Sequence, residues 1–580
     1  MTELLSALTD SEAGCPILGK SWFEEAKFTG ETSFSGARFS GDAIFSGATF
    51  SDYVAFWDVT FDNVADFSHT SINGIRFGRS IFSTEANFFA SKISEAWFVG
   101  AQFLKGVDFT EATFIGNAGF VGASFAGMTM FNSVHFNGEA LFHRASFLGH
   151  TEFVDVTFNQ QAVFDDANFT QYSHFSNASF AREARFNGAT FTEGVRFEYA
   201  SFLGTQSLGP LLCRGDLAFD WATFSGPATI EAVAFNLSCK GTKWESTATL
   251  RLRHVVVDLT DAVLTQPFAV TAHPGPFRYR SLTPLPNESE RNLDESTVDW
   301  NTGVSLCSLR GVDCAMVSLA DIDLTKCRFV GAFHLDQLRL EGQWSLRTPP
   351  HTRVWRLGFP FRWTQRQVVE EERQWRALPS RQAPLREGWG NPPQNQHEVP
   401  GLATLTIIYR QLRKAREDAK DEPGAADFYY GEMEMRRHGR KRSQAERWLL
   451  HAYWLLSGYG LRASRALGWL ALAMTTTILL MMGFGLPQDS PKQAATGTVP
   501  PGGGRVTFKM DKEDPRNPTR DRFTGERFDK ALSVTLNSVV FRSSGQDLTT
   551  AGGYIEMASR FSEPVLLGLA ALAIRGRVKR

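Results

Sequence analysis

The sequence predicts a mainly β protein, a solenoid of stacked short strands followed by a helical hairpin and a C-terminal α-helical segment that crosses a membrane twice. Three observations support this prediction. Of the 49 phenylalanines in the 580 residues, 36 lie between Phe23 and Phe235. Many of them recur at a fixed period, which is typical of repeat architectures. Near the C-terminus, residues 466–486 contain no charged side chain, and a run of this length is sufficient to cross a bilayer.

The phenylalanine repeat has an eleven-residue period, because the intervals from Phe103 to Phe202 alternate between six and five residues without a break. A small residue precedes most of these phenylalanines by two positions, so that both side chains lie on one face of an extended segment. The same period would suit a right-handed coiled coil, but the segment lacks the Leu, Glu and Lys that such helices need. Each unit is therefore expected to be a very short strand and a turn, burying its phenylalanine against neighbouring coils. The phenylalanines expected at the core of the repeats include Phe103, Phe114, Phe125, Phe136, Phe147, Phe158, Phe169, Phe180, Phe191 and Phe202.

The repeat unit has the pattern A-x-F-x-x, as in ASFLGHTEFVDVTFNQQAVFDDANF at residues 145–169, and it resembles the pentapeptide-repeat proteins. The resemblance covers residues 23–235. It implies a right-handed quadrilateral β-helix with the large residue and the preceding small residue both inside. One residue is inserted in every second unit, so a four-sided coil would hold about 22 residues and the segment about ten coils. The insertion would either bulge at a corner or distort the square section.

Further β-structure is expected beyond the phenylalanine-rich segment. Residues 1–22 are predicted to form an N-terminal cap and residues 23–240 the solenoid itself. Apolar and polar residues alternate in residues 241–345, which indicates additional strands. Within that segment lies a second repeat run at 304–340, with five-residue spacing between Leu309, Cys314, Leu319, Leu324 and Phe329.

A connector and a helical hairpin are expected next. Residues 346–400 are rich in Pro, Arg, Gln and Trp, which is typical of a connector. One helical patch interrupts it, and the glutamates of its VEEERQ motif are predicted to lie on a helix surface with i,i+4 pairing. Residues 401–447 are predicted to form a helical hairpin that ends in a basic cluster.

Residues 448–580 are expected to form the membrane domain, with spans at about 466–486 and 558–574 and an outer loop at 487–527. No signal peptide opens the chain, and the six scattered cysteines suit buried thiols in a reducing cytosol. Two crossings would place both the solenoid and the C-terminus on the cytoplasmic side of a bacterial inner membrane. The basic residues expected to flank the membrane are Arg436, Arg437, Arg440, Lys441, Arg442, Arg575, Arg577 and Lys579.

The sequence contains no recognisable catalytic constellation. A P-loop, a GxSxG motif and an HExxH motif are all absent. His135, His143 and His150 are close in sequence but do not have metal-ligand spacing, so we expect them at the surface. We therefore expect no enzymatic activity, no cofactor and no bound metal.

The function predicted from these observations is that of a non-enzymatic, membrane-anchored scaffold whose cytoplasmic solenoid binds another protein along its faces. The lipid bilayer is the other expected partner, and a homo-oligomer is compatible with the sequence. The formal charge of −2 excludes a generally basic nucleic-acid binder, and no nucleic-acid partner is expected.

Two alternatives remain open. Ala531–Phe541 resembles a half-length pore helix, and Thr549–Tyr554 faintly echoes the selectivity loop of two-span channels without its residue order, which suggests a channel-like or signalling module. Residues 23–236 carry 23 acidic against 11 basic side chains, a net charge of −12. Because some pentapeptide-repeat proteins mimic DNA and bind topoisomerases, the resemblance also implies this second alternative.

Overall fold

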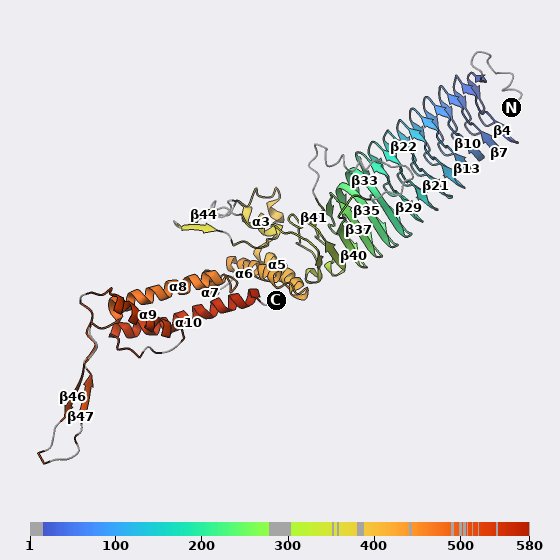
Figure 1. The fold of residues 1–580 in the computed structure, drawn as a ribbon. Helices are drawn as coiled ribbons and strands as arrows, with labels where there is room; N and C mark the ends of the chain where they lie inside the picture. Colours follow the sequence, from blue (N-terminus) through green and yellow to red (C-terminus); the bar gives the residue numbers. More distant parts are fainter. Residues whose placement is uncertain are drawn as a thin grey trace. The chain divides into compact units, whose positions relative to one another are not determined.

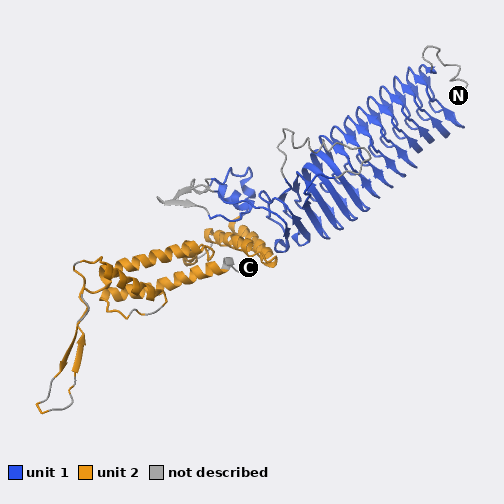
Figure 2. Cartoon of the chain, in the orientation of Figure 1, with its two compact units in different colours: residues 1–400 blue, residues 401–580 orange. Residues whose placement is uncertain are grey.

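The structure is a computed structural model. It divides into two compact units, residues 1–400 and residues 401–580 (Figure 2). Each unit is described by itself. The structure describes residues 15–277, 303–350, 353–356, 359–362, 364–379, 388–439, 444–488, 492–497, 501–502, 506, 508–512, 514–519, 521–540, 543 and 545–578.

Unit 1 is a parallel β-solenoid of about 14 turns over residues 17–341, which confirms the predicted fold class (Figure 1). A representative coil has four two-residue strands, and each strand pairs in parallel with its equivalent in the next coil. Gln102 thus pairs with Ser124, which pairs with Ser146 in turn. The strands of this coil are β14 (Gln102–Phe103), β15 (Val107–Asp108), β16 (Thr113–Phe114) and β17 (Ala118–Gly119).

The corners of the coil explain the alternating five- and six-residue spacing. Connections of three residues, such as residues 115–117, alternate with connections of four, such as residues 109–112. The longer connection is a tight turn in which the Ala112 N–H donates to the Phe109 carbonyl at 2.9 Å and Glu111 has a φ of 60°. The inserted residue is therefore taken up at alternate corners. Left-handed residues recur at this turn, with glycine at some positions and polar residues at others. They include Gly100, Glu111, Gly122, Ser133, Arg144, Asp155, Asp166, Asn177, Gly188 and Tyr199.

The interior of the solenoid consists of ladders of phenylalanine rings. Phe103 stacks on Phe125 with ring centroids 5.0 Å apart, and Phe125 stacks on Phe147 at 4.8 Å. Rings of neighbouring ladders meet edge to face, as Phe103 and Phe109 do at 6.3 Å. Offset stacking and edge-to-face contact are the two arrangements that aromatic rings prefer. Each of the ten phenylalanines named from the sequence has no more than 1% of its surface exposed.

Toward its C-terminal end the solenoid has longer strands and shorter coils. The coil shortens to 20 residues where Ala228 pairs with Ala248 and Ala248 with Phe268. The five residues that mark the second repeat run are buried in the last coils: Leu309, Cys314, Leu319, Leu324 and Phe329. The longer strands are β33 (Gln206–Ala218), β35 (Ala228–Ser238), β37 (Ala248–Arg253), β38 (Val256–Asp258), β40 (Phe268–Ala272), β41 (Ser305–Ser308), β42 (Val317–Ala320) and β43 (Arg339–Glu341).

Helix α3 (Glu370–Ala377) packs against the last coils, and the prediction that its glutamates lie on a helix surface is wrong. Glu371 is 1% exposed, and its Oε1 accepts hydrogen bonds from the N–H groups of Phe329 (2.5 Å) and Val330 (2.8 Å). A carboxyl oxygen of a buried side chain thus accepts two backbone N–H groups at the end of the solenoid, where buried donors need partners. A short antiparallel pair, β44 (Arg353–Arg356) and β45 (Phe359–Arg362), precedes α3.

Unit 2 is helical in most of its described residues. The predicted hairpin is present as α5 (Leu402–Asp418) and α6 (Glu422–His438), and the Asp421 side chain caps α6 by accepting from the Gly424 N–H at 3.0 Å. The remaining helices are α7 (Gln444–Ser457), α8 (Ala463–Leu480), which continues as one π-helical turn at Met481–Gly485, α9 (Gly525–Val539) and α10 (Thr550–Val578).

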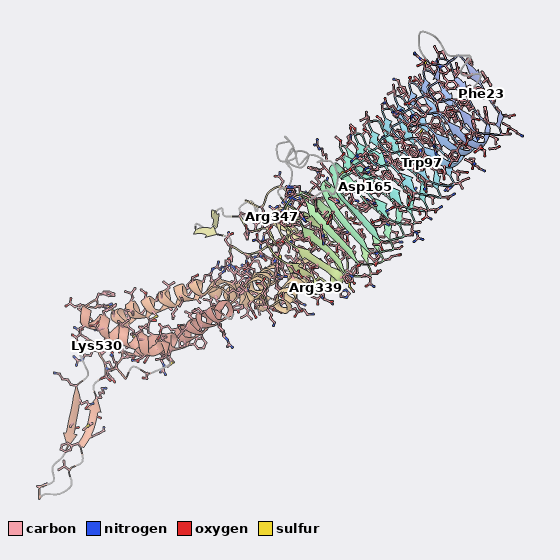
Figure 3. The ribbon with its side chains drawn as sticks, turned by 45° about the vertical axis from the view of Figure 1, so that its right-hand side comes forward. Phe23, Trp97, Asp165, Arg339, Arg347 and Lys530 are labelled. Carbon is pink, nitrogen blue, oxygen red and sulfur yellow. The ribbon has the colours of Figure 1, made fainter. Side chains whose placement is uncertain are left out.

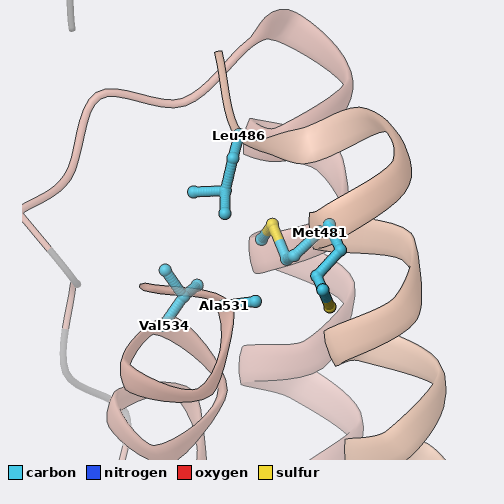
Figure 4. Packing of buried hydrophobic residues seen from close by; sticks show 5 residues of the cluster. Met481, Leu486, Ala531 and Val534 are labelled. Atoms are coloured by element: carbon cyan, nitrogen blue, oxygen red, sulfur yellow. The ribbon is translucent and has the colours of Figure 1, made fainter. Parts of the chain in front are cut away.

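Two segments of unit 2, Ala463–Gly485 and Thr550–Arg575, are long and apolar enough to cross a membrane. The second helix begins eight residues before the predicted start of its span. The predicted outer loop also contains structure, because β46 (Gln493–Gly497) pairs with β47 (Phe508–Lys512) and α9 begins before residue 527. The C-terminal end of α8 packs on α9 through an apolar cluster (Figure 4). Its members are Met481, Met482, Leu486, Ala531 and Val534.

Candidate functional site

A surface on the early coils of the solenoid carries aromatic and arginine side chains. We call Tyr53, Trp57, Arg76, Arg79 and Trp97 the aromatic patch. Its three strands, β7 (Thr49–Ala55), β10 (Ser71–Arg76) and β13 (Lys92–Trp97), are longer than the two-residue strands around them and pair in parallel. Figure 3 labels Trp97 on this part of the solenoid.

The aromatic rings of the patch pack on glycines of the following coil. A Cβ on Gly74 would lie 2.4 Å from the Tyr53 ring, and a Cβ on Gly78 would lie 2.3 Å from the Trp57 ring. Trp97 covers Gly119 in the same manner, at 2.5 Å. Each ring therefore occupies the space that a side chain of the next coil would fill, which compensates for the exposed glycine backbone.

Charged groups fix the edges of the patch. The Tyr53 hydroxyl donates to Glu95 Oε2 at 2.6 Å, and this bond raises the pKa of Tyr53. The Arg76 guanidinium lies 5.4 Å from the centre of the Tyr53 ring, and that of Arg79 lies 5.3 Å from the Trp57 ring. Such contacts are cation–π interactions. The patch is thus a rigid surface of ordered side chains.

The composition of the patch is the one that protein-binding hot spots favour, since Trp, Tyr and Arg dominate them. Trp57 remains 43% exposed although its ring lies against Gly78. The sequence alone did not indicate these residues. Each ring packs on a glycine that is about one coil away in the sequence, so no local motif marks the contact. The recurring aromatic-to-glycine offset of 21 or 22 residues is a signal that could have found them.

Of the three histidines that are close in sequence, His135 is exposed, and His143 and His150 are partly exposed. His150 Nε2 lies 3.4 Å from Glu152 Oε1, and its ring lies 5.1 Å from that of His174. Partial burial lowers the pKa of His174 below its ordinary value. Over the described part of the chain, no group of three or more His, Cys, Asp or Glu side chains could hold a metal ion.

Two of the basic residues predicted to flank the membrane neutralise buried carboxylates in unit 2. Arg436 pairs with Glu432, and Arg437 pairs with Glu434 at 2.6 Å, both within α6. The Arg437 guanidinium also lies 4.3 Å from the centre of the Trp454 ring. Arg575 is exposed near the end of α10. The other predicted positions, or their side chains, fall outside the described residues: Arg440, Lys441, Arg442, Arg577 and Lys579.

The loop predicted to resemble a channel selectivity loop is largely helical, which corrects that expectation. Residues 550–554 form the first turns of α10. The Thr549 hydroxyl accepts from the Gly552 N–H at 3.1 Å and donates to the Phe484 carbonyl at 2.7 Å. Because threonine side chains of this kind satisfy the unpaired N–H groups of a first helical turn, Thr549 favours the start of a helix here.

Comparison with protein families identifies the repeats. The family described as Pentapeptide repeats (9 copies) matches residues 13–60, 98–145, 131–179 and 164–206. All four segments lie in unit 1, so the phenylalanine-rich part of the solenoid is built from pentapeptide repeats. Comparisons with curated proteins and with solved structures found no match.

Proposed function

We propose that this pentapeptide-repeat chain is a non-enzymatic scaffold tethered to a membrane by α8 and α10, with the solenoid on the cytoplasmic side. The observation that carries the proposal is the joining in one chain of a long, regular solenoid and two helices of membrane-spanning length and composition. A repeat solenoid presents extended binding faces, and its membrane helices would confine those faces to the bilayer surface.

The aromatic patch is the part of the solenoid that we propose binds another protein. Its rings are held in place before binding, so little side-chain entropy is lost when a partner covers them. Trp57 and Arg79 would supply the central contacts, because both remain substantially exposed and they are already in contact with each other.

Site-specific photo-cross-linking in intact cells tests the proposal. A photoreactive residue at position 57 of the full chain should give a discrete protein adduct, whereas one at Thr157, on a strand of a later coil, should not. The adduct partner, purified, should then bind the full chain.

The binding measurement has a matched control within the chain. Trp57→Ala should weaken the partner's affinity roughly tenfold or more. Trp221→Ala should leave the affinity unchanged. Trp221 is 54% exposed and also packs on a glycine, because a Cβ added to Gly241 would lie 2.5 Å from its ring. Equal adducts at positions 57 and 157, or equal losses from the two tryptophan variants, would contradict the proposal.

A further inference from the structure

A carboxyl group is buried between the two helices that are long enough to span a membrane. Glu563 lies on α10 and has no exposed surface. The Thr477 hydroxyl of α8 donates to Glu563 Oε1 at 2.9 Å. The second oxygen, Oε2, is buried and has no hydrogen-bond partner in the described part of the chain. Half of this carboxyl group is therefore unsatisfied.

Among the side chains that the structure describes, those around Glu563 supply hydroxyl groups and no cation. One turn earlier on α10, Ser559 donates to Ser538 of α9 at 2.9 Å. Pro564 follows Glu563 and has no N–H to donate within the helix. No described charged side chain on these helices forms an ion pair with Glu563. Those side chains are Arg465 on α8, Glu526, Arg527, Asp529 and Lys530 on α9, and Glu556, Arg560 and Arg575 on α10.

The absence of a neighbouring cation determines which form of the carboxyl is stable in a bilayer. An ionised carboxylate without a paired cation is costly in an apolar interior, and more so where lipid replaces water. A proton on Oε2 removes that charge. Oε1 then keeps its hydrogen bond from Thr477, so protonation does not break the contact between α8 and α10.

A groove lies beside Thr477, the residue whose hydroxyl donates to the carboxyl. The groove has a volume of about 500 Å³ and lies between α8 and α10. Thr476, Thr477, Ser559 and Ser562 line it together with apolar side chains of both helices. Thr477 therefore faces the groove and bonds to Glu563 at the same time, which links the buried acid to an accessible hydroxyl-lined surface.

We propose that Glu563 is a proton-binding site inside the membrane, where an exchangeable proton on Oε2 permits α8 and α10 to pack together. The site rests on the proposed function, because it requires α8 and α10 to lie in a bilayer. Release of the proton would leave a charge between the helices with one hydroxyl as its partner. The membrane segment would then respond to pH in addition to anchoring the solenoid.

A hydrophobic carbodiimide tests the site in membranes that contain the full chain. A protonated carboxyl adds across the N=C bond: its oxygen bonds to carbon, its proton moves to nitrogen, and the product rearranges to a stable N-acylurea without a leaving group. Mass spectrometry of the α10 peptide should show this adduct on Glu563 at neutral pH, and the adduct should be lost at alkaline pH. Glu563→Gln should abolish it. Glu526, which is exposed and paired with Lys530 at 2.8 Å, should remain unlabelled.

Matched threonine variants test the role of the hydrogen bond. Thr477→Val removes the donor that stabilises the ionised form, so labelling of Glu563 should persist to higher pH. Thr475→Val should change nothing, because Thr475 does not line the groove and its hydroxyl donates to the Ala471 carbonyl of its own helix.

Sedimentation separates the two claims. If the chain sediments with membranes and Glu563 stays unlabelled, or is labelled equally at every pH, the proton site is contradicted and the tether stands. If the chain does not sediment with membranes, the tether is contradicted and the proton site with it.

Discussion

Phe158, in the middle of the solenoid, is held by rings above, below and beside it. Phe158 stacks on Phe136 (5.1 Å) and Phe180 (5.0 Å) and meets the edge of Phe164 at 6.1 Å. Its neighbour Thr157 belongs to the same strand, β24 (Thr157–Phe158), and points to the opposite face. Adjacent residues thus sit in opposite environments, and a charge should be tolerated at one and not at the other.

Phe158→Asp should destabilise the solenoid by more than about 4 kcal/mol, because it buries a charge without a partner and removes four ring contacts. Thr157→Asp, one residue away, should cost less than about 1 kcal/mol. Thermal unfolding of the full chain, followed by the circular dichroism of its β-structure, measures both. Equal unfolding temperatures for the two variants would refute the inward assignment of the phenylalanines.

Glu371 should make the packing of α3 on the solenoid pH-dependent. Burial raises its pKa from 4.5 to about 7. A raised pKa means that Glu371 binds its proton more tightly in the folded state than in the unfolded chain. Protonated Glu371 therefore contributes its full stabilisation of the folded state below pH 4.5, and this contribution is lost as the pH rises through about 7. The loss amounts to roughly 3 kcal/mol.

Hydrogen exchange measures this pH dependence. The amides of Phe329 and Val330, corrected for intrinsic exchange, should lose protection as the pH rises from 4.5 to about 7. Glu371→Gln keeps a carbonyl oxygen as acceptor and cannot ionise, so its protection should stay constant. The same pH dependence in that variant would assign the effect to another group.

At the residue scale, sequence periodicity predicts the buried positions that recur in every coil. It does not predict buried charged residues that occur only once. The phenylalanine ladder follows from spacing alone, because every coil presents the same contact. Glu371 and Arg437 resemble ordinary charged residues of surface helices. Their burial depends on backbone groups and side chains far away in the sequence, such as Phe329 for Glu371 and Trp454 for Arg437.

The crossing of α8 and α10 depends on two glycines. A Cβ on Gly552 would lie 2.3 Å from the Gly485 carbonyl oxygen, whereas a Cβ on Gly553 would have no neighbour within 4 Å. Small residues at such a crossing allow helices in a membrane to approach closely.

Gly552→Val should separate the two helices and destabilise unit 2 by about 1–3 kcal/mol, because the backbone must move to accept the side chain. Gly553→Val should have a much smaller effect, although the residue is on the same helical turn. Thermal denaturation of the detergent-solubilised full chain compares them. Similar melting of both variants would show that the Gly485–Gly552 approach is not needed.

At the scale of elements, the sequence predicts the kind of element better than its ends. The helical hairpin and both apolar helices are present. The start of α10 was missed, because the threonines and glycines of residues 549–554 favour a loop in the sequence, whereas residues 550–554 are helical. The contact that buries Glu563 comes from Thr477 of another helix, and hydropathy along one segment cannot report it. The corner that accommodates the inserted residue depends on backbone angles, which residue spacing does not reveal.

At the scale of the whole molecule, the proposed binding surface lies in one unit, and the two helices long and apolar enough to cross a membrane lie in the other. Unit 1 carries the aromatic patch, whose rings pack on glycines of the following coil. Unit 2 carries Glu563, which is fully buried on α10. The account predicts that loss of the aromatic patch abolishes partner binding without releasing the chain from the membrane. It also predicts that substitution of Glu563 alters the response to pH without altering partner binding.

Membrane fractionation with protease protection tests the central claim of a membrane-tethered solenoid most directly. The full chain carries one tag after Met1 and another after Gly502, between the two apolar helices. We predict that the chain sediments with membranes, that external protease removes the tag at 502 and that the N-terminal tag is shielded. A chain that remains in the soluble fraction, with both tags equally accessible, would contradict the membrane tether.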